Sequence, residues 1–438
     1  MTAAGAGWGG DRVVYMLLAA LVPLGLLGYW ACGRDLFAPG MMLVLVTAFT
    51  TGCALYNMPL WQFELSGWTV WLLVSTLAVG VVLNGLVHAC ARRVRIIPWQ
   101  GQSRPIPAGA SWAVLAVLAV VAGIMLSQIR QIAGTGFFVE VMVRFRTRNS
   151  YGTDLADQLP LWVRQLLSLA AVLEVLYLFN LFKHGKRMGR LDRALNLGVV
   201  ALATLVSLLT GGRFSAMTAL VAAFVLWYML GPDGPRALRP GRMVRAALVA
   251  LGVLYLFYGV RVFVGRQSEQ GMLEYITHYA GGSLPGLDLY FKDPPPPSDI
   301  WGKETFYSLN QGLRKLGLLE IPYYLVHHEF RRSGGGSIGN VYTALRDYHY
   351  DFGLAGMYLL HIVFVLFFSV FYEYQKRRRS DLGLIVLAMM YYALAFYMIS
   401  NFFYANLVSF GFAIRLGMTA ALYLLLMGKR RGRPWTAG

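Results

Sequence analysis

Long stretches with few or no charged residues recur along the chain, and they constrain its fold more than any other feature. The first covers residues 13–31 and the last covers residues 407–427. A helix needs about 20 apolar residues to cross a bilayer. Only 14% of the 438 residues are charged, whereas soluble proteins carry about 25%. The sequence therefore predicts an all-α polytopic membrane protein.

Length and lack of charge together predict about eleven transmembrane helices. Their ranges are 13–31, 41–60, 68–89, 111–132, 161–182, 194–210, 214–230, 244–264, 354–372, 382–401 and 407–427. The first range has no basic segment before it and no small-x-small cleavage site after it, so we interpret it as a retained helix and not as a signal peptide. The whole chain, residues 1–438, is predicted to be a single transmembrane domain.

Basic residues follow every second predicted span, and they indicate the orientation of the chain. Cytoplasmic loops are enriched in Lys and Arg, so an odd number of spans places the C-terminus in the cytoplasm and the N-terminus outside. This topology explains most of the net charge of +18, and no nucleic-acid partner is expected. The clusters are Arg92, Arg93, Arg95 and Arg104; Lys183, Lys186, Arg187, Arg190 and Arg193; Arg236, Arg239, Arg242 and Arg245; Lys376, Arg377, Arg378 and Arg379; and Lys429, Arg430, Arg431 and Arg433.

One long polar interval, residues 265–353, separates the eighth and ninth predicted spans and is expected to face outward. Loops of this kind usually carry function, whereas the helices position them. Residues 269–280 and 303–315 are predicted to form short helices, and the glycines at 334–336 a flexible hinge. Asn340 is expected to cap a last short helix before the ninth span.

Arginine is unexpectedly frequent near the outward side of the predicted membrane. Arg213 lies in a Gly-Gly turn, Arg261 and Arg266 lie at the end of the eighth span, and Arg415 lies inside the eleventh. The arginines at every second position from Arg144 to Arg148 would point the same way on an extended backbone. A guanidinium at membrane depth needs a wet cavity, an anion or a carboxylate partner. Because its planar fork suits phosphate oxygens, we expect an anion at Arg213 and Arg261.

The end of the long loop carries a second group of polar residues. If residues 340–352 are helical, Tyr342, Arg346 and either His349 or Tyr350 share one face. Asp351 and His349 are then candidate general bases. The alternative for Asp351 is that it only caps or hydrogen-bonds the start of the ninth span.

Some signatures of metal or nucleotide chemistry are missing from the sequence. There is no Asp-x-Asp, no Walker A sequence, and no group of His and carboxylate residues at metal-ligand spacing. We therefore expect no cofactor and no metal. An enzyme with a phosphate leaving group would then neutralise it with arginines.

Three short motifs are similar to those of the oligosaccharide repeat-unit polymerases of O-antigen, capsule and exopolysaccharide assembly, which are related to O-antigen ligases. The motifs are Gly-Asn-Val-Tyr-Thr-Ala-Leu-Arg-Asp-Tyr-His-Tyr-Asp-Phe-Gly at 339–353, Thr-Gly-Gly-Arg-Phe-Ser at 210–215 and Arg-Val-Phe-Val-Gly-Arg-Gln at 261–267. The likeness also extends to the order of the spans and to the large outer loop.

The resemblance implies a GT-C-type fold in the bacterial inner membrane with an active site facing the periplasm. Such enzymes transfer a growing glycan from undecaprenyl pyrophosphate to the terminal sugar hydroxyl of a lipid-linked repeat unit. Arg213 and Arg261 would hold the donor pyrophosphate, and Arg266 and Arg346 would assist. The base would be His349 or Asp351. A chain-length regulator and a flippase are the implied protein partners. Asn340 and Tyr342, in the longest motif, are expected to contact the substrate.

Two alternatives share part of this pattern. An O-antigen ligase would use the same type of donor but would transfer the glycan to a lipid A core. A polysaccharide flippase would favour broken helices, charges along a central pathway and repeated halves, and the sequence gives little sign of these.

Overall fold

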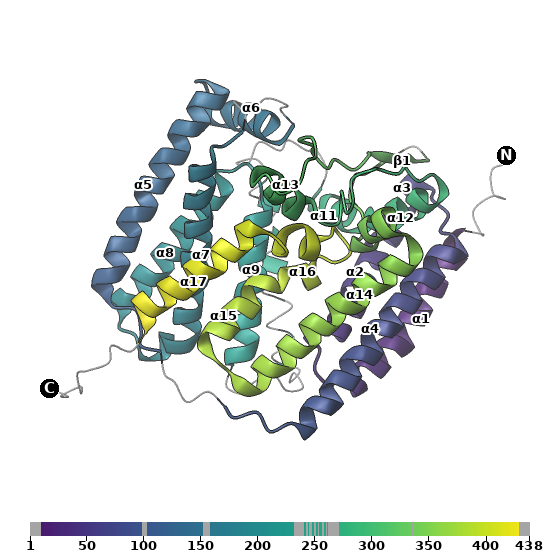
Figure 1. The fold of residues 1–438 in the computed structure, drawn as a ribbon, viewed down its shortest axis with the longest axis horizontal. Helices are drawn as coiled ribbons and strands as arrows, with labels where there is room; N and C mark the ends of the chain where they lie inside the picture. Colours follow the sequence, from purple (N-terminus) through teal and green to yellow (C-terminus); the bar gives the residue numbers. More distant parts are fainter. Residues whose placement is uncertain are drawn as a thin grey trace.

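The computed structural model describes residues 10–98, 103–151, 158–231, 271–334 and 336–428, together with scattered positions between 241 and 261. Within these ranges the regular secondary structure is helical apart from one two-stranded hairpin (Figure 1). Arg266 and most of the predicted eighth span lie outside the described residues. So do the basic cluster at 429–433 and most of the one at 236–245.

Eight of the described helices are long and apolar enough to cross a membrane, which confirms the prediction of an all-α polytopic membrane protein. They are α1 (Gly10–Ala31), α2 (Pro39–Tyr56), α4 (Gly67–Arg93), α5 (Ala108–Ala133), α7 (Leu161–His184), α8 (Arg190–Leu208), α14 (Ala344–Arg378) and α17 (Phe410–Met427). Two shorter apolar helices, α9 (Phe214–Leu230) and α15 (Asp381–Met390), occupy the places of the seventh and tenth predicted spans.

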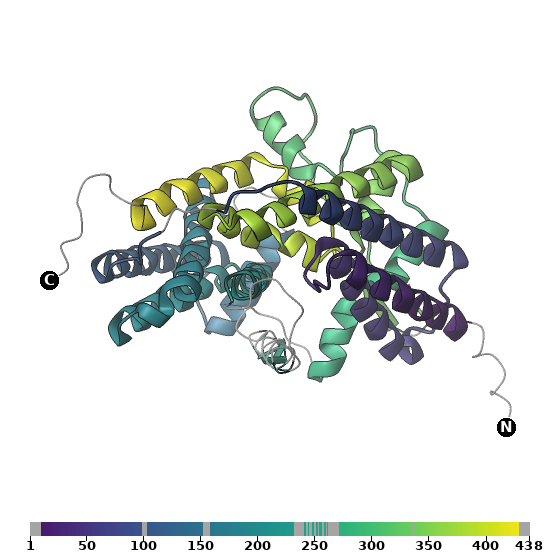
Figure 2. The ribbon, with the colours of Figure 1, turned by 90° about the horizontal axis from the view of Figure 1, so that it is seen from below.

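The helices form two groups with a third set between them. Helices α1, α2, α4 and α14 pack together, and α5, α7 and α8 form the other group, with α9, α15 and α17 in the middle (Figure 1). Seen from below, the purple helices and the teal ones lie toward opposite ends of the molecule (Figure 2). Helix α1 buries one stripe: Val14, Leu17 and Leu21 are buried, whereas Leu27 and Trp30 are more than 60% exposed. Exposed apolar faces of this kind suit contact with lipid.

At one end of the molecule, a buried aspartate joins the first group to α9 of the middle set. The carboxylate of Asp35, in the α1–α2 connection, is fully buried and accepts hydrogen bonds from Tyr228 at 2.6 Å and Tyr372 at 3.0 Å. It also pairs with the ammonium group of Lys376 at 2.6 Å. A buried charge is tolerated only when it is paired in this way, so these contacts fix α9 and α14 against the α1–α2 connection.

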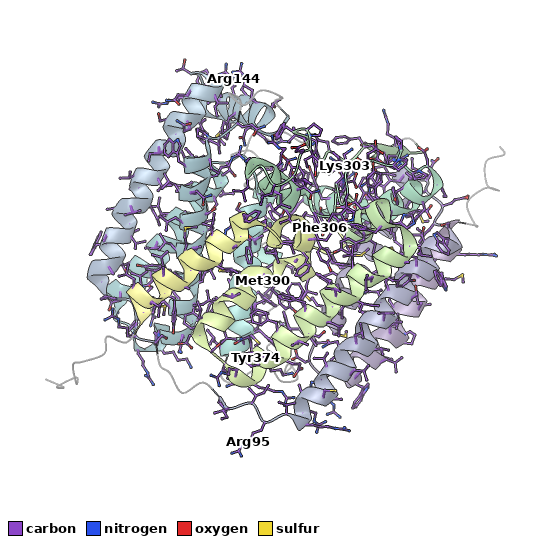
Figure 3. The ribbon with its side chains drawn as sticks, in the orientation of Figure 1. Arg95, Arg144, Lys303, Phe306, Tyr374 and Met390 are labelled. Atoms are coloured by element: carbon purple, nitrogen blue, oxygen red, sulfur yellow. The ribbon has the colours of Figure 1, made fainter. Side chains whose placement is uncertain are left out.

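The short elements gather at the other end, which we call the loop end. They are α3 (Met58–Trp61), α6 (Phe138–Tyr151), α11 (Met272–Gly281), α12 (Ser283–Lys292), α13 (Tyr307–Lys315), β1 (Arg331–Ser333) and β2 (Gly336–Gly339). Arg144 and Lys303 lie at the loop end, and Arg95, from a basic cluster, lies at the opposite end (Figure 3). The two short helices predicted within the long loop are present, with shifted bounds. A short 3-10 helix, η2 (Gly185–Arg187), follows α7.

Two local predictions for the loops are wrong, and a third, the flexible hinge at 334–336, stays a prediction. The glycines predicted to form a hinge lie beside the β1–β2 hairpin: Gly336 pairs with Ser333, and Gly334, at φ +53°, packs against the carbonyl of Trp61; residue 335 lies outside the described residues. The segment from Arg144 to Arg148 is helical, so its arginines do not all point one way. Thr343, and not Asn340, occupies the N-cap of α14.

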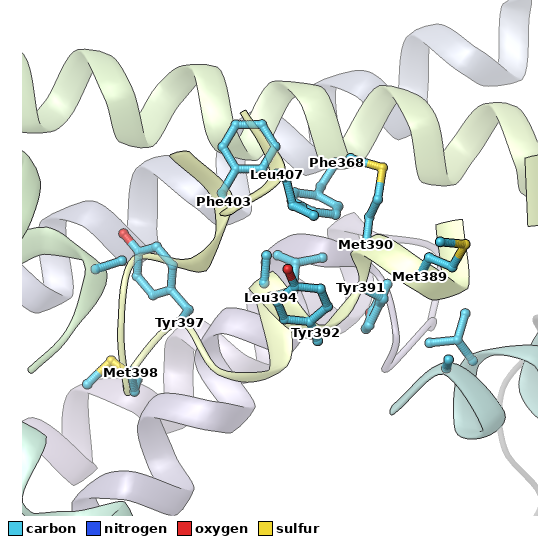
Figure 4. Close-up of a cluster of buried hydrophobic side chains, with 14 of the residues drawn as sticks. Phe368, Met389, Met390, Tyr391, Tyr392, Leu394, Tyr397, Met398, Phe403 and Leu407 are labelled. Atoms are coloured by element: carbon cyan, nitrogen blue, oxygen red, sulfur yellow. The ribbon is translucent and has the colours of Figure 1, made fainter. Parts of the chain in front are cut away.

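The tenth predicted span is not one continuous helix. After α15, the chain forms the short helix α16 (Tyr392–Ala395), leaves helical geometry, and then forms the π-helix η3 (Phe403–Leu407) before α17. Non-helical backbone at membrane depth has to be enclosed by protein, and here Tyr397 and Phe403 lie in a buried apolar cluster (Figure 4). The carbonyl of Tyr397 accepts the first backbone N–H of α14, from Ala344, at 2.9 Å. The irregular segment thereby fixes where α14 begins.

Candidate functional site

The Gly-Gly turn between α8 and α9 places Arg213 against the long loop. Gly211 adopts φ +75°, a left-handed conformation that favours glycine, and packs against the Arg146 side chain of α6. Arg213 is the N-cap residue of α9 and is only 6% exposed. Its guanidinium carbon lies 5.0 Å from the ring centroid of Tyr275 and 5.6 Å from that of Tyr279, both on α11.

Arg261 reaches the same group of aromatic rings. Its guanidinium carbon lies 3.5 Å from the ring centroid of Tyr258, and the Tyr258 ring lies 5.8 Å from that of Tyr275. Arg213 and Arg261 therefore flank a pair of contacting tyrosines. The structure thus brings together two arginines that are 48 positions apart in the sequence. Aromatic faces stabilise a guanidinium without neutralising its charge.

An apolar cavity of about 290 Å³ opens beside Arg213. Its lining comes from α7, α8 and α9, and it includes Leu178, Val200, Leu208 and Leu220. Among the described residues that line the cavity, Arg213, at the loop end of α9, is the only cation, and Glu174 of α7 is the only carboxylate. An apolar space between helices with one cation at its end suits an amphiphile that has an apolar chain and an anionic head.

Arg346 occupies a different environment, enclosed by carboxylates. It is fully buried, and its Nη2 lies 3.0 Å from an oxygen of Glu329, while Nη1 pairs with Glu304 and lies 3.5 Å from Asp347. The ring of Tyr342 lies 4.7 Å from its guanidinium carbon. The charge of Arg346 is thus already balanced, and its contacts tie the start of α14 to two separate segments of the long loop.

His328 joins this cluster through Asp347. Its Nε2 lies 3.0 Å from Oδ1 of Asp347, and burial, together with the positive charge of Arg346, lowers the pKa of His328 to about 3. Burial raises the pKa of the nearby Glu304, although the charge of Arg346 opposes the shift. At neutral pH His328 is therefore uncharged, and burial together with the nearby Glu304 raises the pKa of Asp347 well above its usual value.

Three groups of this cluster are close enough to bind one metal ion together. The sequence did not predict such a site, because the three residues are far apart along the chain. The ligand atoms of Glu304, His328 and Asp347 all lie within 4.8 Å of one another. The same two carboxylates are paired with Arg346. A divalent cation would compete with that guanidinium, so the cluster as it stands is an ion-pair network.

The two candidate bases both have partners in the long loop. Nδ1 of His349 lies 2.9 Å from the hydroxyl of Tyr290 on α12. A carboxylate oxygen of Asp351 accepts the backbone N–H groups of Glu304 at 3.1 Å and Thr305 at 2.6 Å. Asp351 therefore anchors the chain before α13, and not the start of the ninth span.

Two further predicted residues, Tyr342 and Asn340, lie in the segment between β2 and α14. Tyr342 donates from its hydroxyl to the carbonyl of Glu329 at 2.9 Å, and Asn340 is half-buried just after β2. No protein-family model, curated protein sequence or solved structure matches the chain. Its function therefore has to be inferred from the chemistry of these groups.

Proposed function

We propose that the protein is a membrane glycosyltransferase that polymerises lipid-linked oligosaccharide repeat units. It transfers a growing glycan from undecaprenyl pyrophosphate to the terminal sugar hydroxyl of an incoming lipid-linked unit. The loop end faces the periplasm of a bacterial inner membrane, and the chain adopts a GT-C-type fold. The observation that carries the proposal is the position of Arg213 beside an apolar cavity between membrane helices.

The cavity and the arginines suit the two parts of such a donor. Apolar side chains from α7, α8 and α9 can surround isoprenoid carbons. The guanidinium of Arg213 can bind pyrophosphate oxygens bidentately and stays charged at any working pH. Arg261, across the Tyr258–Tyr275 pair, adds a second cation near the same headgroup.

The transfer breaks the bond between the anomeric carbon and the pyrophosphate oxygen, and it forms a bond from that carbon to the acceptor oxygen. Negative charge grows on the departing pyrophosphate, where fixed cations stabilise the transition state. The acceptor hydroxyl loses its proton to a base. We assign this role to His349, because Asp351 already accepts two backbone N–H groups.

Substitution of Arg213 tests the proposal. We expect Arg213→Ala to reduce polymer formation per folded enzyme about 100- to 1,000-fold, which is typical for loss of a contact aimed at transition-state charge. Arg213→Lys keeps the charge but loses the fork, so it should retain more activity than Ala. Arg144→Ala is the matched control, because this arginine also lies at the loop end but is exposed on α6. Near-normal specific activity of Arg213→Ala would refute the assignment.

A deletion strain separates the proposal from its alternatives. Loss of a polymerase leaves single repeat units on the lipid A core. Loss of a ligase strands polymer on the lipid carrier. Loss of a flippase traps repeat units on the cytoplasmic side.

A further inference from the structure

A second cavity, of about 340 Å³, lies on another side of α9 and has a polar lining. Its wall includes Ser215 and Thr218 of α9, Tyr392 of α16, and Asn406 of η3. Ser308 of α13 lines it as well, so the long loop borders the cavity at the loop end. None of these groups belongs to the clusters around Arg213 or Arg346.

Small residues in the first half of α9 explain why both cavities exist. Ser215, Thr218 and Ala222 line the polar cavity, whereas Ala216 and Ala223 line the apolar one. Side chains this short leave space on both sides of a helix. Glu174 of α7 and Ala219 of α9 line both cavities, and the two spaces are therefore neighbours that share part of one wall.

Arg415 gives the polar cavity its positive charge. It lies in the second turn of α17, and its Nη2 makes a long contact of 3.4 Å with the hydroxyl of Ser168. Its Nε is buried and has no hydrogen-bond partner in the described part of the chain. Within the same ranges, no carboxylate lies at ion-pair distance from Arg415. A guanidinium in a membrane helix without a carboxylate partner favours an anion in the cavity beside it.

Two further features restrict where that anion can sit. Gly411, in the first turn of α17, also lines the cavity, and the positive end of the helix dipole adds to the charge of Arg415. Glu174 lies on the wall contributed by α7 and accepts a hydrogen bond from the hydroxyl of Thr204. Its carboxylate disfavours an anion nearby and can accept hydrogen bonds from hydroxyl groups.

We propose that this cavity binds the phosphate-bearing headgroup of a second lipid-linked substrate, the acceptor of the transfer. The identification of the acceptor rests on the proposed polymerase function, which requires two such lipids at once. The anion site itself rests only on Arg415 and the polar lining. Donor and acceptor headgroups then lie on two sides of α9, bound by Arg213 and Arg415.

The number of diphosphate lipids bound per protein tests this arrangement directly. The purified protein is placed in phosphatidylcholine nanodiscs with a sugar-free polyprenyl diphosphate, and the complexes are counted by native mass spectrometry. Wild type and the control Arg93→Ala, which removes an exposed arginine at the opposite end, should bind two. Arg213→Ala and Arg415→Ala should each bind one. Thr218→Leu, which fills the polar cavity and keeps Arg415, should also bind one.

Kinetics with separately labelled donor and acceptor then identify the second lipid. Arg415→Ala should raise the half-saturating acceptor concentration about 10- to 100-fold, the effect expected for one charge-assisted hydrogen bond, and leave that of the donor unchanged. Two diphosphates bound to Arg415→Ala would overturn the proposal, as would displacement of the second diphosphate by phosphatidylglycerol. If wild type binds two diphosphate lipids, one dependent on Arg213 and one on Arg415, but does not polymerise repeat units, the polymerase function is refuted and the second anion site is supported.

Discussion

Replacement of Arg346 by methionine should destabilise the fold rather than impair substrate binding alone. The guanidinium is fully buried and contacts Glu304, Glu329 and Asp347. Glu329 keeps a second cation, because Arg331 lies 2.9 Å from its other oxygen. Methionine therefore leaves the carboxylates of Glu304 and Asp347 buried without their cation.

The size of the effect follows from the burial of the cluster. Removing one partner of a buried ion pair costs about 3–5 kcal/mol, because the remaining charge is not solvated. That is a large share of a typical folding free energy of about 5–15 kcal/mol. Arg346→Met should therefore sharply reduce the yield of folded protein and lower its melting temperature. Adding Glu304→Gln removes one unpaired charge and should recover part of the loss.

The assay is thermal unfolding of the purified protein in detergent, together with polymer formation per folded enzyme. Each variant is compared with Glu304→Gln alone, which retains the guanidinium. If Arg346→Met melts like wild type but loses activity, Arg346 acts on the substrate, as its sequence motif suggested. The ion-pair account would then be wrong.

Further predictions concern pH, strain, topology and metal. Burial and Arg346 lower the pKa of His328 to about 3 in the folded protein, whereas its value in the unfolded chain is about 6.5. Below pH 6.5 the unfolded chain therefore binds a proton that the folded protein does not, and the free energy of unfolding falls by about 1.4 kcal/mol per pH unit. His328→Gln should remove this slope from unfolding measured between pH 7 and pH 4. Gly353 adopts φ +62° and ψ −167° with open space around it, so Gly353→Ala should lose about 1–3 kcal/mol of stability from backbone strain alone. A membrane-impermeant thiol reagent should label Ser337→Cys in cells with a permeable outer envelope and leave the exposed native Cys90 unlabelled; the reverse would invert the topology. Polymerisation should persist in EDTA. If EDTA abolishes polymerisation and Mg²⁺ or Mn²⁺ restores it, a metal takes part.

The membrane helices could be predicted because their signal is local. Length and lack of charge identify a helix such as α4 or α14 from its own residues, and no knowledge of its neighbours is needed. The same local signal failed at the tenth span. Residues 396–402 contain only two polar residues, Ser400 and Asn401, yet buried partners such as Ala344 and Phe364 hold them in an irregular path.

The candidate site was predictable only in part, because its partners come from distant segments. Arg213 and Arg261 were identified as unusual cations at the end of spans, and the structure joins them through Tyr258 and Tyr275. Nothing in the local sequence indicates that Glu304 lies against Arg346, 42 positions away. The segment between them includes one predicted short helix, at 303–315, but its pattern does not show where that helix packs.

The two cavities also suggest how one round of polymerisation would lead to the next. In the proposed transfer, the lengthened glycan ends on the carrier that entered as acceptor, so it lies on the Arg415 side of α9. The carrier on the Arg213 side has lost its glycan and must leave. Before the next round, the lengthened lipid has to reach the Arg213 side. Since Ala219 lines both cavities, the two headgroup sites are neighbours. A short transfer between them, on a path that keeps the pyrophosphate away from the Glu174 carboxylate on the shared wall, would allow several additions before the polymer is released.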